Sequence, residues 1–381
     1  MKTLSYKIYS STKEFPKNWD DFAGSNIFFS SNYLAVLENA APKNMICHFI
    51  GVFEFQKLVG IAITQMVSVA NISSFGVNKS CFQSKIRDIV FKNFANNILF
   101  IGNNMLTGQN AFVCSELIMY SDFISEIHKA SKELQEIFSK QGKKIHIVNF
   151  KDFEKHEIEK MNAPLFDDYY QFEIQPNMVF EIPQNWNSND DYIAALSKKY
   201  RDQYKRAHKK MQGVEKRKLS LEEIIHYNDL IFKLYLNVTK NAPFNTFYLS
   251  ENHFVELKKQ LANDFLFYGY FFDDKLVGFD TLIKNGIAMD TYFLGYDDAI
   301  QREKMLYLNM LYDMIGYSIN KKFKTIIFAR TALEIKSSVG AKPLKMFGFI
   351  KHNNIIINKL MPKLFKYFEP QVVWKERNPY K

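Results

Sequence analysis

F-K-T-I-I-F-A-R-T-A-L-E-I-K-S-S-V-G-A-K-P-L-K-M-F-G-F-I-K-H, residues Phe323 to His352, is the stretch from which the fold of this 381-residue chain is inferred. Thr325 to Phe328 is a run of β-branched and aromatic residues, which is the composition of a strand buried on both faces. Pro343 forbids a helix beyond it, and Met346 to Ile350 has the composition of a second strand. The stretch therefore predicts two strands with a short connection.

A short helix is expected in that connection. Thr331 is followed three residues later by Glu334, the spacing of a capping box, so the helix should begin at Ala332 and end at Gly340. Arg330 then stands where a central strand passes into a helix. Ligands of open α/β sheets collect at the carboxyl ends of strands, so a functional site is expected here.

Composition limits the class of protein. The length favours two domains, and 47% hydrophobic residues can supply a core for each. The three cysteines lack metal-ligand spacing and suggest no disulfide framework, and the amino terminus lacks a signal-peptide core. No run reaches the roughly 18 apolar residues of a membrane span. The eight histidines form no metal-ligand pattern, and no nucleophile elbow is visible. A cytoplasmic protein without a metal is expected.

The two halves of the chain carry the same order of predicted elements. The first half has strands at 46–54, 58–68, 99–101 and 145–150 and a helix at 121–140, preceded by a strand at 5–9 and helices at 16–22 and from 31. The second half has strands at 265–272, 276–283, 287–294 and 325–328 and a largely buried helix at 304–320. Residues 70–98 give no clear pattern.

Short sequence matches support a duplication. Lys57-Leu58-Val59-Gly60 and Lys275-Leu276-Val277-Gly278 each open the second strand of a hairpin. We therefore predict an N-terminal domain at 1–175, a connecting segment at 176–191 and a C-terminal domain at 192–381 that carries the site. The connecting segment is rich in proline and asparagine.

This order of elements resembles the Gcn5-related N-acetyltransferase (GNAT) fold. Three passages carry the resemblance, namely F-I-G-N-N-M-L-T-G from Phe100, Y-F-L-G-Y-D from Tyr292, and A-R-T-A-L-E-I-K-S-S-V-G-A from Ala329. The tandem version is similar to Fem-type peptidyltransferases and to predicted peptidoglycan-biosynthesis acyltransferases. The resemblance implies a mixed α/β (α+β) fold of two tandem GNAT-like domains. It also implies an acyltransferase that transfers an acyl or aminoacyl group onto an amine in cell-envelope biosynthesis.

One loop departs from the GNAT pattern. GNAT enzymes hold the coenzyme A pyrophosphate on a glycine-containing loop, because glycines let backbone N–H groups approach phosphate. The equivalent loop here, G-Y-D-D-A-I-Q-R-E-K from Gly295, has two aspartates and no glycine behind Gln301 and Arg302. The sequence therefore argues against tight binding of free acetyl-coenzyme A.

Positive charge is concentrated in one segment. The formal net charge is +10, and ten Lys and Arg residues lie between Ser197 and Lys218, including Lys205 and Arg206. Apolar residues recur at spacings of three and four, so one amphipathic helix is expected from about Asn189. Two interpretations stay open, a solvated face or a surface that receives a phosphorylated donor or an anionic membrane. A lysine-rich composition bias is the alternative explanation of the net charge.

Asp290 is the candidate general base. It lies inside a predicted strand, where an unpaired carboxylate is costly. Alternation places it on the same face as Tyr292, which is a second catalytic candidate. An amine acceptor must lose a proton before it attacks, and a carboxylate that removes it contributes roughly 10²–10⁴ in rate. Structural pairing with a neighbouring base is the alternative.

The stretch from Phe323 to His352 adds four candidate site residues. Arg330 can bind a donor phosphate or an acceptor carboxylate bidentately, with Thr331 and Lys336 beside it. Glu334 is a further catalytic candidate. The structural alternatives are an Arg330–Glu334 pair across one helical turn, a capping role for Glu334 and a solvated lysine.

The function expected from these observations is N-acyl transfer from a thioester of coenzyme A or an acyl carrier protein to an amine, without a tightly bound cofactor. One alternative is a Fem-like peptidyltransferase that uses aminoacyl-tRNA. A second is a non-catalytic protein that binds an anionic polymer or a membrane surface. Peripheral contact with an anionic membrane fits each of these, and no DNA partner is expected.

Overall fold

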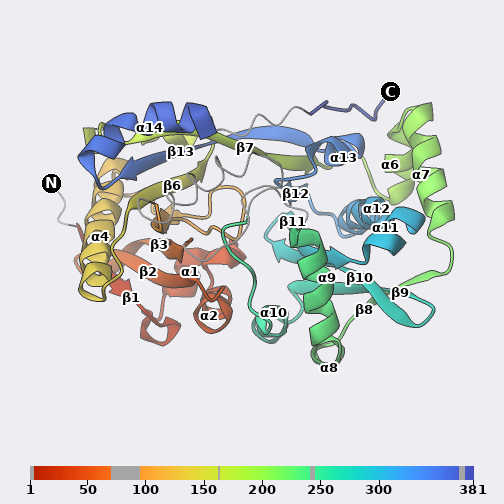
Figure 1. Ribbon diagram of the computed structural model, residues 1–381, viewed down its shortest axis with the longest axis horizontal. Coiled ribbons are helices and arrows are strands. Elements are labelled where there is room, and N and C mark those ends of the chain that lie inside the picture. The colour runs from red at the N-terminus through yellow and green to blue at the C-terminus, as the bar shows by residue number, and fades with distance from the viewer. Residues whose placement is uncertain (1–3, 70–94, 162–163, 241–244, 369–373) are drawn as a thin grey trace, which may run out of the picture. The chain divides into compact units, whose positions relative to one another are not determined.

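The computed structural model describes residues 4–69, 95–161, 164–240, 245–368 and 374–381, which form two compact units (Figure 1). Unit 1 comprises Met1–Gln175, Pro243–Ser250 and Lys345–Gln371. Unit 2 comprises Pro176–Ala242, Glu251–Leu344 and Val372–Lys381. The sequence places residues 345–368 in the second domain, whereas in the structure they belong to unit 1.

Unit 1 is a mixed sheet with helices. Its strands are β1 (Leu4–Tyr9), β2 (Met45–Glu54), β3 (Lys57–Ser68), β4 (Asn97–Ile101), β5 (Phe112–Cys114), β6 (Ile147–Phe153), β13 (Lys342–His352) and the first part of β7 (Tyr170–Glu181). Its helices are η1 (Thr12–Glu14), α1 (Trp19–Ala23), η2 (Ile27–Phe29), α2 (Ser31–Ala40), α4 (Tyr120–Lys140), α5 (Lys155–Lys160), η3 (Pro164–Phe166) and α14 (Ile355–Phe368). The strand order is β1-β2-β3-β4-β6-β13, with β5 paired to β3.

The sheet of unit 1 takes a strand from near the end of the chain. β13 pairs antiparallel with β6, which sets Phe349 opposite Phe150 and Ile350 opposite Asn149. Phe349 and Phe150 are both buried in the core of this unit, so the pairing of β13 with β6 adds apolar contacts as well as backbone hydrogen bonds. This pairing is the physical reason that β13 from Phe347 to His352 belongs to unit 1.

Unit 2 has a second mixed sheet, to which the later part of β7 contributes. Its other strands are β8 (Val214–Lys218), β9 (Phe265–Phe272), β10 (Lys275–Asn285), β11 (Ala288–Tyr296) and β12 (Thr325–Ala329). Its helices are α6 (Asn189–Ala195), α7 (Lys198–Lys210), α8 (Leu221–His226), α9 (Asn228–Lys240), α10 (His253–Leu261), α11 (Asp298–Lys304), α12 (Leu306–Asn320) and α13 (Leu333–Ser338). The strand order is β7-β12-β11-β10-β9-β8, and only β11 and β12 run parallel among these pairs.

The two units repeat one arrangement. β3 lies between β2 and β4, and β10 lies between β9 and β11, so the two Lys-Leu-Val-Gly passages open strands in equivalent places. A long helix follows in each unit, α4 or α12, and then a strand parallel to the third one. α12 is apolar almost all round and packs in the core, as its sequence predicts. The predicted duplication of element order is therefore present in the fold.

Two predicted helices are interrupted. The segment from Asn189 to Met211 forms α6 and α7, because Leu196 is extended and pairs with Tyr380 of the C-terminal tail. The predicted helix at 304–320 begins at Leu306, and the left-handed Met305 separates it from α11. The prediction of one continuous amphipathic helix from Asn189 is therefore wrong.

Most of the segment without a clear sequence pattern, residues 70–94, lies outside the described residues. Within the described part of the chain, no helix combines the length and the apolar character needed to cross a membrane.

Candidate functional site

The parallel pairing of β11 with β12 ends part-way along β11. The paired residues run from Ala288 with Thr325 to Asp290 with Ile327. β11 then continues to Tyr296 beside β10, whereas β12 continues beside β7. In unit 1, by contrast, the parallel ladder of β4 and β6 extends to Ile101, the last residue of β4. The two parallel strands therefore separate beyond Asp290 in unit 2, and this is the place to look for a site.

A β-bulge lies on β11 at the point of separation. On β10, Leu282 faces Thr291 and Asp280 faces Leu294, so β11 carries an extra residue between these pairs. Bulges of this kind redirect side chains and occur frequently beside active sites. The Thr291 hydroxyl, just beyond the last ladder pair, donates to the carbonyl oxygen of Ile327 at 3.0 Å.

Asp290 is buried, with 7% of its surface exposed. Burial raises the pKa of its carboxyl group to about 7, and a hydrogen bond from the Asn285 side chain opposes that shift. Its Oδ2 atom has no hydrogen-bond partner among the described residues. A carboxyl group with a pKa near neutrality can take up and release a proton in the physiological range, which is the property required of a general base.

Tyr292 forms a contact that the sequence does not indicate. Its hydroxyl lies 3.0 Å from Nε2 of His253, the first residue of α10, and the two rings are stacked at 5.8 Å between centroids. His253 is fully buried. The neighbouring Met289 packs in the core that includes α12 residues, so Met289 and Tyr292 contact opposite sides of the sheet, as strand alternation predicts. His253 belongs to no motif, and no sequence signal would have found it.

Arg330 follows β12 within a conformationally strained segment. Ala329, Thr331 and Ala332 all have positive φ angles, of 58°, 70° and 46°. Each such non-glycine residue costs roughly 1–3 kcal/mol and persists only where the surrounding structure imposes it. Burial lowers the pKa of Arg330 to about 10, and its Nη2 atom is enclosed. The fold therefore holds a partly desolvated guanidinium at the carboxyl end of β12, as expected.

Lys336 forms hydrogen bonds with the backbone of this strained segment. Its Nζ donates to the carbonyl oxygens of Phe328, of Ala329 at 3.3 Å and of Arg330 at 2.6 Å. Lys336 is 5% exposed, and burial lowers its pKa to about 7. The expected alternative, a solvated lysine, does not apply. Its ammonium group instead ties α13 to the end of β12, so Lys336 positions Arg330.

Glu334 and Thr331 do not form the predicted capping box. Ala332, in a left-handed conformation, occupies the N-cap of α13 without a side-chain hydrogen bond. The Glu334 carboxylate is exposed and accepts from Nε of Arg377 at 2.9 Å and from Nη2 of the same residue. This pairing holds the pKa of Glu334 below its usual range. The capping-box prediction is therefore wrong, and Glu334 joins α13 to the C-terminal tail.

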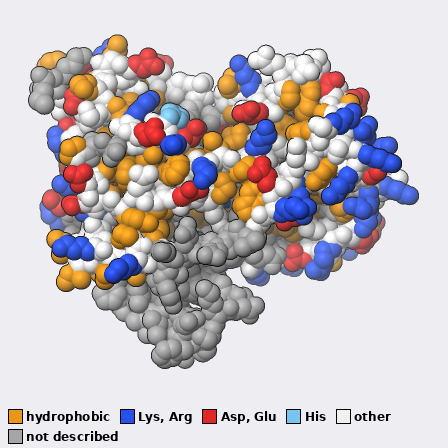
Figure 2. Space-filling view, turned by 90° about the horizontal axis from the view of Figure 1, so that it is seen from above, with side chains coloured by type: hydrophobic (Ala, Val, Ile, Leu, Met, Phe, Trp, Pro, Cys, Tyr) orange, Lys and Arg blue, Asp and Glu red, His pale blue; other side chains and the backbone are white. Residues whose placement is uncertain are grey.

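Lys205 and Arg206 lie apart from these strand ends, exposed on α7. Tyr200, Tyr204 and Ala207 of the same helix are buried, as the apolar spacing predicts. The exposed cations of the helix are Lys198, Lys199, Lys205, Arg206, Lys209 and Lys210. Figure 2 shows Lys and Arg side chains gathered at the end of unit 2 that carries α6 and α7. No acidic side chain in the described part of the chain forms an ion pair with these six.

The loop after β11 places its own carboxylate at a helix N-terminus. Asp297 caps α11 by accepting from the backbone N–H groups of Ala299 at 2.9 Å and Ile300 at 3.2 Å. Backbone N–H groups at such a position bind phosphate in glycine-containing loops. Here an aspartate satisfies them, which agrees with the absence of glycine from this loop. Gly295 serves packing instead, because a Cβ there would lie 2.6 Å from the α9 backbone at Leu234.

In unit 1 the equivalent region is closed by polar groups. Lys151 is 4% exposed, and its Nζ donates to the carbonyl oxygens of Asn103 at 3.1 Å and Leu106 at 3.2 Å. The Asn103 side chain accepts from Gln65 and donates to the hydroxyl of Tyr33. These contacts occupy the space beyond the β4–β6 ladder. Unit 2 is therefore the better candidate for a working site.

A metal centre is not indicated. No group of three or more His, Cys, Asp or Glu side chains among the described residues is arranged to hold a metal ion.

Solved structures similar to this chain share its fold. FemX is 10% identical, with a TM-score of 0.52 over 96% of this chain and 100% of that one. A tandem GNAT protein from the clavulanic acid biosynthesis pathway, solved without AcCoA, is 8% identical, with a TM-score of 0.51 over 92% of this chain and 99% of that one. A conserved protein of unknown function from Bacteroides thetaiotaomicron is 10% identical, with a TM-score of 0.50 over 92% and 100%.

The chain therefore has the mixed α/β, tandem GNAT-like fold that its sequence predicts, similar to that of FemX. No protein family and no curated protein matches the sequence itself.

Proposed function

We propose that this protein transfers an acyl group from a thioester donor to an amine acceptor, at a site in unit 2. The observation that carries the proposal is the separation of β11 from β12 beyond Asp290 and Ile327, with a buried carboxyl group at its origin and Arg330 at the end of the second strand. The likeness to FemX and to a tandem GNAT protein supports acyl or aminoacyl transfer as the class of reaction.

In the proposed reaction the Asp290 carboxylate removes a proton from the ammonium form of the acceptor, directly or through a water molecule. The neutral amine then attacks the donor carbonyl carbon, a new C–N bond forms, and the C–S bond of the thioester breaks. The thiolate that leaves takes up a proton. Arg330 binds an anionic group of the donor or acceptor, because a guanidinium pairs bidentately with carboxylate or phosphate. Lys336 and the Tyr292–His253 pair act as positioning residues.

The donor we favour is a thioester of a carrier protein or of coenzyme A. In the case of coenzyme A, the loop after β11 does not bind the pyrophosphate. Asp297 already satisfies the amides of α11, and a further anion there would meet its negative charge. A carrier-bound thioester needs no pyrophosphate site. The exposed cations of α7 supply an electrostatic surface for an acidic carrier.

Transfer from aminoacyl-tRNA is the second candidate. Two observations favour it, the similarity to FemX over 96% of this chain and the cationic surface of α7. Binding of tRNA releases many counterions and should weaken steeply between about 50 and about 200 mM salt.

The deciding experiment offers purified full-length protein three donors in parallel with a panel of amines. The donors are long-chain acyl-coenzyme A, an acylated carrier protein and charged tRNA. Product formation from a thioester, abolished by Asp290→Asn, supports the main proposal. Transfer from charged tRNA alone, abolished by Lys205→Glu with Arg206→Glu, supports the second candidate. A protein that uses none of the donors, yet binds acidic polymer through α7, would be a binding protein instead.

A further inference from the structure

A cavity of about 610 Å³ lies in unit 2 where α12 ends, away from the β11–β12 separation. It is lined by Lys218, Asn263, Leu266, Tyr268, Lys284, Tyr317, Lys321 and Phe323. Leu266 packs in the core that contains α12, whereas Tyr292 contacts α10 on the opposite side of the sheet. An open cavity of this size can receive a small organic ligand while part of that ligand stays in contact with solvent.

Register and helical spacing bring these residues together. Tyr317 and Lys321 are four residues apart, so they share one face of α12 at its C-terminal end. On the sheet, the β8–β9 register sets Lys218 opposite Tyr268. Lys284 comes from the end of β10, beside the start of β9. The fold therefore gathers three lysines from three separate elements around one opening.

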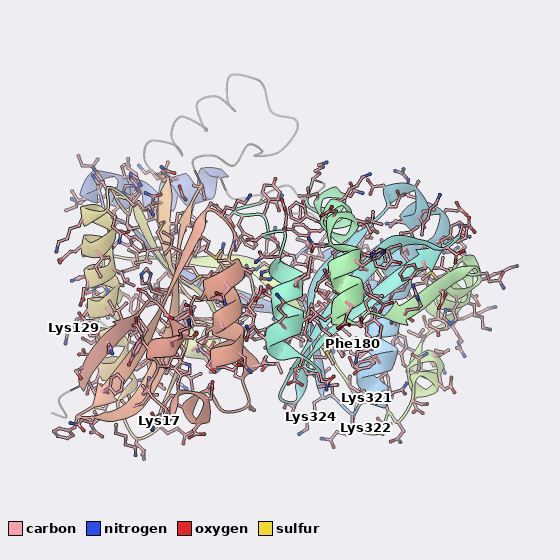
Figure 3. The ribbon with its side chains drawn as sticks, turned by 90° about the horizontal axis from the view of Figure 1, so that it is seen from below. Lys17, Lys129, Phe180, Lys321, Lys322 and Lys324 are labelled. Atoms are coloured by element: carbon pink, nitrogen blue, oxygen red, sulfur yellow. The ribbon has the colours of Figure 1, made fainter. Side chains whose placement is uncertain are left out.

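This opening carries an excess of positive charge. Only Lys284 has an acidic partner, the exposed Asp264 at 3.8 Å. For Lys218 and Lys321, no acidic side chain in the described ranges lies within ion-pair distance. Burial and then repulsion by Lys218 and Lys284 lower the pKa of the nearby Lys258. Figure 3 shows Lys321, Lys322 and Lys324 close together past the end of α12, and of these three Lys321 lines the cavity.

The wall of the cavity is aromatic and held in place. The rings of Tyr268 and Tyr317 meet edge to face, with 6.1 Å between centroids. Nζ of Lys216 lies 4.4 Å from the Tyr268 centroid and 3.2 Å from Oδ2 of Asp313, which fixes it over the ring. Burial raises the pKa of Tyr268, so its hydroxyl remains a neutral hydrogen-bond donor. Lysines at the rim and rigid aromatic rings inside suit a ligand with one anionic end and one flat apolar part.

We propose that this cavity binds a phosphate ester of nucleotide size, with its phosphate between Lys218, Lys284 and Lys321 and its ring or chain against Tyr268 and Leu266. The site is additional to the transfer site and depends on no residue assigned to that reaction. A soluble molecule and the headgroup of a lipid are the two sources of such an ester, and they share the same recognition chemistry.

The test uses full-length protein and two probes. Titration calorimetry with adenosine diphosphate measures binding of a soluble phosphate ester, and co-sedimentation with vesicles containing phosphatidic acid measures binding of a membrane-borne one. The test variant is Lys218→Gln with Lys321→Gln. The control is Lys17→Gln with Lys129→Gln, which removes the same charge from exposed lysines of unit 1 (Figure 3).

The test variant should weaken binding of whichever probe is bound by about tenfold or more, since two charge-assisted contacts are lost, and the control should leave it unchanged. Selective loss of nucleotide binding identifies a soluble ester, and selective loss of vesicle binding identifies a lipid. An equal effect of both variants would show a nonspecific charge effect and overturn the proposal. Failure of the wild-type protein to bind either probe would overturn it as well.

Discussion

Asp290 and Ile327 form the last pair of the parallel ladder between β11 and β12, and β11 continues to Tyr296 without its parallel neighbour. A strand that loses a neighbour inside a sheet exposes backbone and side-chain surface to a ligand. The ladder of unit 1 has no comparable interruption, because β4 pairs with β6 up to its own end. This difference between the units is the reason that we propose the transfer site in unit 2.

Replacing Asp290 by asparagine should lower kcat/KM by roughly 10²–10⁴, because the variant cannot accept the proton of the acceptor amine. In the wild-type protein, kcat/KM should rise with pH through about 7 as the carboxyl group ionises. Steady-state rates at a series of pH values check both statements. Asp264→Asn, which removes an exposed carboxylate, is the control and should retain wild-type activity.

The same substitution should change the pH dependence of stability. The pKa of Asp290 is about 7 in the folded protein and near its ordinary value of 3.8 when unfolded. Protonated Asp290 therefore contributes to the free energy of unfolding. This contribution is fully present below the unfolded pKa and is lost as pH rises to about 7. Asp290→Asn should abolish this loss, which is on the order of 4 kcal/mol for a shift of this size. Urea unfolding at pH 4 and pH 8 measures it, and parallel pH profiles for the two proteins would contradict it.

Arg330→Ala should reduce activity much more than stability. Arg330 is held by strained backbone and by Lys336, so the segment keeps its course when the guanidinium is removed. We expect activity to fall by at least about tenfold, the equivalent of one lost charge-assisted contact. Arg302→Ala, at an exposed arginine of α11, is the matched control. A variant that unfolds but retains its activity per folded molecule would assign Arg330 a structural role.

Glu334 can be tested against its partner. If the Glu334–Arg377 pair is only structural, Glu334→Gln and Arg377→Gln should each lower the free energy of unfolding only slightly, because both side chains are solvent-accessible and water screens the pair. Their effects on activity should then be equally small. A loss of activity confined to Glu334→Gln would instead restore the catalytic role that the sequence suggested. A double-mutant cycle in urea separates the pair energy from the two single effects.

The left-handed N-cap of α13 offers a substitution that should stabilise the fold. Ala332 has φ 46° and ψ 40°, a conformation that glycine adopts without steric cost. Ala332→Gly should raise the free energy of unfolding by up to about 1 kcal/mol, after the entropic cost of glycine. Ala299→Gly within α11 is the control and should be destabilising. A loss of stability in Ala332→Gly would show that tertiary contacts favour the alanine.

The sequence predicts most elements of this fold because they depend on local pattern. The strands at 265–272 and 276–283 and the helix at 121–140 appear within a few residues of their predicted limits. Apolar periodicity decides such elements before any tertiary contact forms.

What the sequence misses depends on residues distant along the chain. Leu196 interrupts the basic helix because Tyr380 pairs with it. Glu334 pairs with Arg377 and does not form the predicted capping box with Thr331. The contact between His253 and Tyr292 likewise joins two elements without a shared motif. Asp290 and Arg330 could be selected as candidates in advance for two reasons. An unpaired carboxylate inside a strand is costly in any context, and ligands of open α/β sheets collect at the carboxyl ends of strands, where Arg330 stands.

The position of β13 in the sheet of unit 1 has a consequence for folding during translation. Because β13 completes the sheet against β6, the N-terminal part of the chain cannot finish its tertiary structure while it emerges from the ribosome. The sheet edge beside β6 stays open until residues 342–352 have been translated. The two units repeat one order of elements, yet a cut in the gene between the two halves would separate β13 from the sheet that it completes.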